Sequence, residues 1–258
     1  MSKRSTCNLE VIQTKEITPN MVRITLGGSD LADFPPGQES GYIKLMFPDA
    51  AGAGGVIDKI KQAVRPTMRT YTIRHFDAVK HEMDVDFVVH GDNGPASKWA
   101  MNARVGDALT IAGPGAKKLV NFDADWFFLI GDMTALPAIS VNIEKLPRDA
   151  KGYCVVEILD EADKQKLDFP DNIDVHWVLN PHPDKENTAL LDTVVALPMI
   201  DGKPSVWAAC EFNTMRALRK HFRTDLNVAR EDIYISSYWK MGMSEEEHKV
   251  VKSKDAQN

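Results

Sequence analysis

The order of apolar segments changes near residue 122, and no other feature of this 258-residue chain constrains its fold as strongly. Before this point, short alternating runs are separated by turn clusters such as Pro35-Pro-Gly37, a pattern typical of antiparallel strands. The expected strands are 22–26, 41–47, 69–74, 83–89 and 108–112. They predict a small antiparallel β-barrel in residues 1–121.

After residue 122, apolar strand-like runs alternate with helix-like runs. The expected strands are 126–130, 152–158, 175–179, 206–209 and 233–238, and the expected helices are 136–145, 190–196 and 214–222. This alternation predicts a parallel sheet covered by helices on both faces. The chain is long enough for two hydrophobic cores, so we expect two domains, the β-barrel in 1–121 and an α/β domain with a C-terminal tail in 122–258.

Composition argues against several classes of protein. A net charge of −6 and a charged fraction of 26% indicate a soluble globular protein without a nucleic-acid partner. The N-terminus lacks an apolar signal core and no window approaches the roughly 20 apolar residues of a membrane span, so we expect a cytoplasmic protein. Cys7, Cys154 and Cys210 are isolated, and the histidines lack metal-ligand spacing. Any redox centre must therefore be a bound organic cofactor.

The segment Arg69-Thr-Tyr-Thr-Ile-Arg74 has a composition suited to a flavin. Alternation along a strand places Tyr71 on one face and Thr72 on the other. A tyrosine ring can stack on an isoalloxazine, a threonine hydroxyl can hydrogen-bond a flavin ring nitrogen, and the guanidinium of Arg69 suits a pyrophosphate. The alternative is an ordinary half-buried strand.

A second segment, His90-Gly-Asp-Asn-Gly-Pro-Ala-Ser97, leads into an expected helix over 95–103. Its glycines allow close backbone approach, and the free N–H groups at the start of the helix suit a phosphate, assisted by Ser97. The alternative is an ordinary turn. Together, and in this order, the two segments predict a binding site for a flavin dinucleotide.

The turn Gly131-Asp-Met-Thr134 follows the first expected strand of the parallel sheet. Ligands of such sheets bind at the carboxyl ends of the strands. We expect Thr134 or Asp132 to cap the next helix, whose amino end would face a nicotinamide nucleotide. The turn lacks a G-x-G-x-x-G fingerprint, so a plain helix cap is the alternative.

These motifs resemble the siderophore-interacting protein family, FAD-dependent ferric-siderophore reductases of the ferredoxin–NADP reductase superfamily. The resemblance spans nearly the whole chain, and its segments are Arg69-Thr-Tyr-Thr72, His90-Gly91 with Gly94-Pro-Ala-Ser97 and Trp99, the turn 131–138, Trp207-Ala-Ala-Cys-Glu211 and Tyr238-Trp-Lys-Met-Gly242. It implies an FAD-binding β-barrel followed by an NAD(P)H-binding α/β domain. It also implies that NADPH or NADH reduces FAD, which reduces siderophore-bound Fe(III) to Fe(II) and releases iron in the cytoplasm.

The resemblance also implies which residues contact the cofactors. They are Arg69, Tyr71 and Thr72 of the flavin motif; Asp86, Phe87 and Val88 of the strand that passes the flavin; His90, Gly91, Gly94, Pro95, Ala96 and Ser97 of the phosphate loop; and Thr134 and Ala135 on the nicotinamide side. Met133 stands where the family often has glutamate and Cys210 where it often has glycine, which leaves the donor open among NADPH, NADH and a ferredoxin. Cys210 is either a reactive thiol or a small packed residue.

Many ferric siderophores are anionic, so the docking site should contain basic side chains near the flavin. The candidates are Lys44, Arg65, Lys117 and Lys240. The alternative functions are a general flavin-dependent ferric-chelate reductase, a ferredoxin-linked electron-transfer flavoprotein and a non-catalytic siderophore carrier. We expect a monomer whose partner is a small ferric chelate.

Overall fold

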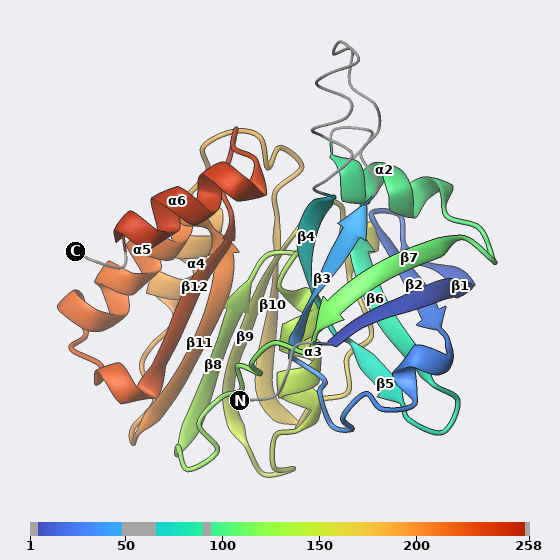
Figure 1. The fold of residues 1–258 in the computed structure, drawn as a ribbon. Coiled ribbons are helices and arrows are strands. Elements are labelled where there is room, and N and C mark those ends of the chain that lie inside the picture. Colours follow the sequence, from blue (N-terminus) through green and yellow to red (C-terminus); the bar gives the residue numbers. More distant parts are fainter. Residues whose placement is uncertain (1–4, 48–65, 90–93, 256–258) are drawn as a thin grey trace. The chain divides into compact units, whose positions relative to one another are not determined.

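The computed structural model describes residues 5–47, 66–89 and 94–255 (Figure 1). The chain divides into two compact units, Met1–Lys117 and Lys118–Asn258. The first unit contains an antiparallel sheet and the second a parallel sheet with helices, which confirms the predicted fold class. The borders that we assign to the functional domains, 1–121 and 122–258, stay predictions. A helix that the sequence also allows over 56–64 lies outside the described residues.

The first unit is a seven-stranded antiparallel sheet with the order β4-β3-β7-β1-β2-β6-β5. Its elements are β1 (Ser5–Thr18), β2 (Met21–Gly27), the short 3-10 helix η1 (Ser29–Leu31), β3 (Tyr42–Phe47), β4 (Thr67–Thr72), β5 (His75–Asp77), β6 (Glu82–Val88), α2 (Pro95–Asn102) and β7 (Ala108–Gly113). All five strands expected here are present. Strands β1 and β5 are not predicted by the sequence pattern.

Side chains from every long strand of this sheet meet in one core. The fully buried members include Val11, Ile24, Ile43, Val85, Phe87 and Ile111. Just after β4, the backbone N–H of Arg74 donates to the carbonyl oxygen of Asp84 on β6 at 3.0 Å. Because β4 begins the strand order and β6 lies near its other end, this bond brings the two sides of the sheet together, as a barrel requires.

The second unit is a five-stranded parallel sheet with the order β10-β9-β8-β11-β12. Its elements are β8 (Trp126–Gly131), α3 (Leu136–Glu144), β9 (Lys151–Ile158), η2 (Glu161–Asp163), β10 (Asn172–Leu179), α4 (Ala189–Ala196), β11 (Pro204–Glu211), α5 (Phe212–Lys220), η3 (His221–Asp225), η4 (Arg230–Asp232), β12 (Ile233–Trp239) and α6 (Glu245–Asp255). All strands and helices expected in this region are present.

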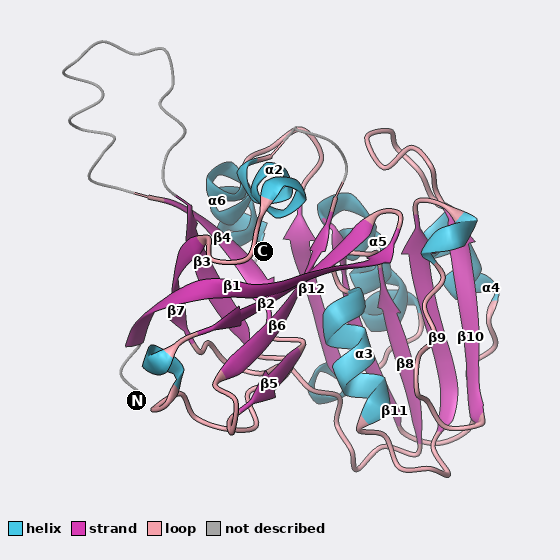
Figure 2. Ribbon diagram, turned by 90° about the vertical axis from the view of Figure 1, so that its right-hand side faces the viewer, coloured by secondary structure: helices cyan, strands magenta, loops and turns pink. Residues whose placement is uncertain are grey.

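Helices cover both faces of the parallel sheet. Figure 2 shows α3 on one face and α5 on the opposite face. Side chains of α4 and α5 pack on the face of Trp126 and Phe128, and Leu218 and Phe222 are fully buried there. Every residue of β8 is buried, as expected for a central strand of a parallel sheet. No helix within the described residues is long and apolar enough to cross a membrane.

Candidate functional site

Strand β4 carries the three residues of the predicted flavin motif. The ring of Tyr71 is half-buried and lies on the ring of Phe87, with 4.4 Å between centroids and 35° between planes. Thr72 is on the other face of the strand and pairs in register with Tyr42 of β3. The guanidinium of Arg69 donates to the carbonyl oxygen of Met68 at 2.8 Å. Tyr71 therefore has a rigid aromatic support on its inner side.

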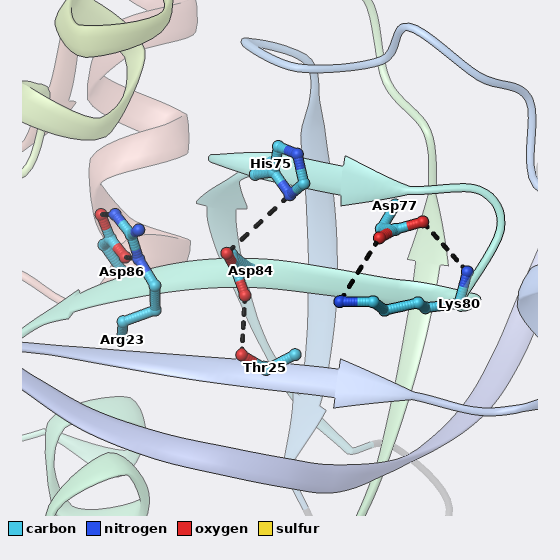
Figure 3. Close-up of polar contacts among 7 residues, drawn as sticks. All are labelled: Arg23, Thr25, His75, Asp77, Lys80, Asp84 and Asp86. Atoms are coloured by element: carbon cyan, nitrogen blue, oxygen red, sulfur yellow. Dashed lines mark hydrogen bonds and ion pairs between the residues drawn. The ribbon is translucent and has the colours of Figure 1, made fainter. Parts of the chain in front are cut away.

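Strand β6 supplies Asp86, Phe87 and Val88, and the structure shows what the first two contact. Phe87 is fully buried, so it supports Tyr71 from the core. Nε and Nη2 of Arg23 donate to the two carboxylate oxygens of Asp86 at 2.6 and 2.8 Å (Figure 3). The Asp86 side chain is only 2% exposed. The ion pair of Arg23 and Asp86 joins β2 to β6. Val88, on the same strand as Asp86, is half-buried.

Figure 3 shows that this pair belongs to a row of polar contacts across β2, β6 and β5. The hydroxyl of Thr25 donates to Asp84 at 2.7 Å, directly across from it in the register of β2 and β6. His75 of β5 lies 4.0 Å from the other carboxylate oxygen of Asp84. Cross-strand pairs of this kind fix the register of a sheet. They hold β6 in place behind the flavin motif.

Helix α2 begins as the sequence predicts. Gly94 is its N-cap residue, makes no side-chain capping bond, and is followed by Pro95 at the first helical position. A Cβ atom at Gly94 would meet no atom of the described residues within 4 Å, so none of these residues fills the space beside the start of the helix. Ala96 and Ser97 are buried in the first turn. The backbone N–H groups in the first turn of a helix suit an anion such as a phosphate. The predicted residues His90 and Gly91 lie outside the described residues.

Three of the four candidate docking residues can be placed. Lys44 bonds to the hydroxyl of Thr70 and lies 5.7 Å from the ring centroid of Tyr42. Lys117 donates to the carbonyl oxygen of Gly37 at 2.7 Å. Lys240 follows β12 in the second unit and lies 4.3 Å from the ring centroid of Phe212. The fourth candidate, Arg65, lies outside the described residues.

The turn after β8 differs from the expectation in one respect. Neither Thr134 nor Asp132 is the N-cap residue of α3, because Ala135 has that position and makes no side-chain capping bond. Instead, the Asp132 carboxylate accepts the backbone N–H of Thr134 at 2.9 Å, and the Asp132 carbonyl oxygen accepts the N–H groups of Ala135 and Leu136. Aspartate favours such a local bond two residues on, which builds the turn before the helix begins.

Buried carboxylates gather at the carboxyl end of this sheet. Burial raises the pKa of Asp132, despite hydrogen bonds from Thr134 and Trp239. Burial also raises the pKa of Glu157, at the end of β9, to about 7, and the charges of Asp132 and Glu211 add to this shift. Like charges in a poorly hydrated place favour the protonated form. The carboxyl end of the parallel sheet, where the sequence predicts the nicotinamide site, therefore contains buried acidic groups.

The two departures from the family pattern are both inside the protein. Met133 is 3% exposed and Cys210 is 1% exposed. Burial, together with the neighbouring carboxylates, raises the pKa of the Cys210 thiol well above its ordinary value. A buried neutral thiol is a poor nucleophile. Cys210 is a small packed residue, and the alternative of a reactive thiol is wrong.

Glu157 should make the stability of the second unit depend on pH. Its pKa in the folded protein is about 7, raised from 4.5 by burial, so between these values the folded state holds a proton that the unfolded state has lost. The stabilisation is complete below the unfolded pKa and is lost as pH rises through the folded pKa. Relative to Glu157→Gln, the wild-type protein should lose about 2 kcal/mol of unfolding free energy across this window.

Urea unfolding at about pH 5 and about pH 8 measures this difference. The control is Glu186→Gln, which replaces an exposed glutamate in the same unit. Equal pH dependence in the wild type and in Glu157→Gln would contradict the assignment.

Several residues of the second unit that bear on the site were not predicted as site residues. Asp132, Glu211 and Trp239 stand at the ends of β8, β11 and β12, where Asp132 accepts the indole N–H of Trp239 and Glu211 accepts the backbone N–H of Met241. One signal was available, because polar residues that directly follow apolar parallel strands face the ligand edge of the sheet. The pairing itself joins residues 107 positions apart, so no local pattern predicts it.

Comparisons with known proteins agree with this arrangement. A family model described as a siderophore-interacting FAD-binding domain matches residues 10–118, and one described as siderophore-interacting protein matches residues 124–242. The chain is 36% identical to the ferric vibriobactin reductase of Vibrio cholerae over 248 residues, which cover 92% of this chain and 90% of that protein. It is 28% identical to the NADPH-dependent ferric-chelate reductase of Escherichia coli, with 90% and 91% covered. A crystal structure of the siderophore-interacting protein from Aeromonas hydrophila superimposes with a TM-score of 0.85 at 33% identity and covers 99% of each chain.

Proposed function

The chain belongs to the siderophore-interacting protein family, and from this premise we propose that it is an FAD-dependent NAD(P)H:ferric-siderophore oxidoreductase. It reduces siderophore-bound Fe(III) to Fe(II) and so releases the iron. One observation supports the proposal most strongly. The unit matched by the FAD-binding family model holds the half-buried ring of Tyr71 on a rigid support and, in the same unit, the start of α2.

The residues of the first unit fit FAD. Tyr71 offers an aromatic face for a flat ring system, and Phe87 prevents its ring from sinking into the core. The start of α2 offers backbone N–H groups to a phosphate, its N-cap Gly94 has no side chain to compete for them, and a Cβ atom at Gly94 would meet none of the described residues within 4 Å. Arg69, on the same strand as Tyr71, adds a permanent positive charge. We propose that Tyr71 and Thr72 hold the isoalloxazine ring. We propose that Arg69 and the start of α2 hold the phosphates, together with His90, Gly91, Gly94, Pro95, Ala96 and Ser97.

Bound FAD would accept two electrons from the nicotinamide donor and pass them one at a time to Fe(III). The protein's own groups bind and orient. The Arg23 and Asp86 pair and the buried ring of Phe87 keep β6 rigid behind Tyr71. Lys44, Lys117 and Lys240, with Arg65, provide positive charge that attracts an anionic ferric complex. Iron leaves after reduction because Fe(II) binds hard anionic oxygen ligands less tightly than Fe(III) does.

We propose that the nicotinamide donor binds at the carboxyl end of the parallel sheet, beside Thr134 and Ala135. Parallel sheets bind nucleotides at this edge, and the turn after β8 begins a helix whose N-cap has no side-chain bond. The buried carboxylates there repel additional anions, so we expect donor affinity to rise as pH falls toward the Glu157 pKa of about 7. A ferredoxin as donor, a monomeric state and a cytoplasmic location stay predictions from the sequence.

Anaerobic stopped-flow absorbance tests the proposed function. The purified protein should be yellow, its flavin absorbance should bleach with NADPH or NADH, and the absorbance should return on mixing with a ferric siderophore while Fe(II) is released. A protein that binds no flavin would contradict the proposal. A flavin that ignores nicotinamides but is reoxidised by the ferric complex after chemical reduction would instead assign the donor role to a ferredoxin.

A further inference from the structure

The segment Trp239–Met241, directly after β12, is held by two carboxylates from neighbouring strand ends. The indole Nε1 of Trp239 donates to Oδ2 of Asp132 at 2.7 Å, and the backbone N–H of Met241 donates to Oε1 of Glu211 at 3.2 Å. Asp132 follows β8 and Glu211 ends β11. All of these residues belong to the second unit. Two strand ends therefore fix the residues on either side of Lys240.

Both carboxylates are themselves held in place. The other oxygen of Asp132 accepts the backbone N–H and the hydroxyl of Thr134, and the other oxygen of Glu211 accepts the N–H groups of Asn213 and Thr214 at the start of α5. Asp132 is 6% exposed and Glu211 is 9% exposed. A buried carboxylate with all its bonds made in one orientation is a rigid anchor.

The anchored segment carries the ammonium of Lys240, which lies beside an aromatic ring and an amide oxygen. The ammonium of Lys240 lies 4.3 Å from the ring centroid of Phe212 and 3.5 Å from the amide oxygen of Asn213. Phe212 is 3% exposed, so its ring is a fixed support for the cation. Among the residues that the structure describes, Lys240 forms no ion pair. Its charge is available to an anion.

We propose that Asp132 and Glu211 are positioning residues that hold Lys240 in the orientation in which it binds an anionic ferric complex. The inference rests on the proposed function and on the docking role of Lys240. A lysine side chain loses substantial conformational entropy when it is fixed on binding. A backbone anchored on both sides of Lys240, and a ring beneath its ammonium, reduce that loss before the ligand arrives. The anchors therefore act on affinity for the anion and leave the electron transfer itself unchanged.

The test compares steady-state kinetics of Trp239→Phe, Glu211→Gln and Lys240→Met with two ferric complexes. The first probe is an anionic ferric tris-catecholate and the second is a ferric trishydroxamate without net charge. Trp239→Phe removes the donor to Asp132 and keeps an aromatic side chain, whereas Glu211→Gln cannot accept from both Met241 and the start of α5. We expect each to raise KM for the catecholate about fivefold, with kcat unchanged, since an ordered charged contact is weakened. KM for the uncharged complex should not change.

Double variants separate positioning from general damage. In a Lys240→Met background, Trp239→Phe should have no further effect on KM for the catecholate, because residues that act through one another are non-additive. An equal rise of KM in both backgrounds, or an equal rise with the uncharged complex, would overturn the proposal. The control is Asp163→Asn, which removes a buried carboxylate that accepts the N–H of Asp160 far from this segment in the chain. It should lower stability and leave KM unchanged.

The outcomes also separate this inference from the proposed function. If the wild-type protein shows no nicotinamide-dependent reduction of either complex, the proposed function fails. If the wild-type protein reduces both complexes and Lys240→Met leaves both KM values unchanged, the reductase stands and the positioning role is wrong.

Discussion

Arg23→Met should lower the unfolding free energy of the first unit by about 3–5 kcal/mol, because it leaves the buried carboxylate of Asp86 without its partner. The guanidinium of Arg23 binds both oxygens of Asp86, and the Asp86 side chain is 2% exposed whereas the Arg23 side chain is 24% exposed. The cost comes from the charge that remains inside the protein. Urea unfolding, followed by circular dichroism, measures this loss as a shift in the unfolding transition of the first unit.

Two further variants make this prediction specific. Arg23→Met combined with Asp86→Leu removes both charges, so most of the lost stability should return. Arg148→Met breaks an exposed pair with Asp168, in which the side chains are 77% and 68% exposed, and should change stability little. Similar losses in Arg23→Met and Arg148→Met would show that burial does not decide the strength of these pairs. Since β6 supports Tyr71, Arg23→Met should also release FAD at a lower temperature than the wild type does.

Gly152→Ala should prevent the second unit from folding stably, with a loss on the order of 3 kcal/mol or more. Gly152 has φ 144°, and a Cβ atom there would overlap the carbonyl oxygen of Phe127 and lie 2.8 Å from the Phe127 backbone nitrogen. The two residues are paired in register between β9 and β8, the centre of the parallel sheet. Neither strand can move aside without breaking the ladder.

Gly242→Ala is the matched control for this variant. Gly242 has φ 71°, and a Cβ atom there would meet no atom of the part of the chain that the structure describes within 4 Å, so the substitution adds backbone strain of about 1 kcal/mol without a collision there. The two variants differ in whether backbone atoms lie in the way. Soluble expression and thermal unfolding should separate them clearly, and equal stability of the two variants would show that β8 and β9 can adjust to the added methyl group.

The apolar pattern alone predicts most of the fold. Strand β8 is a dense apolar run, helix α3 follows it, and α4 follows β10, both helices at lengths expected in an α/β domain. The missed strand β1 shows the limit of this pattern. Residues 6–11 alternate between exposed and buried, but residues 12–16 are all exposed, so much of the strand lacks an apolar face. Pairing with β2 and β7 holds it in the sheet instead.

The candidate flavin site shows the same division. Tyr71 and Thr72 follow from strand alternation, and the start of α2 follows from Gly94 and Pro95, because strand period and helix capping depend on neighbouring residues. The partner of Asp86 could not be predicted in this way. Arg23 lies 63 residues away, and only the pairing of β2 with β6 brings the two side chains together.

Sequence by itself determined which residue types are present, the strand and helix periods, the two-domain order and the family motifs, since all of these are properties of short segments. The tertiary structure alone decided which side chains meet. It placed Cys210 in the core rather than at a reactive surface, and it joined Asp132 to Trp239 across 107 residues. The physical reason is that burial and long-range hydrogen bonds depend on how strands are ordered in a sheet, and strand order is not written in any one segment.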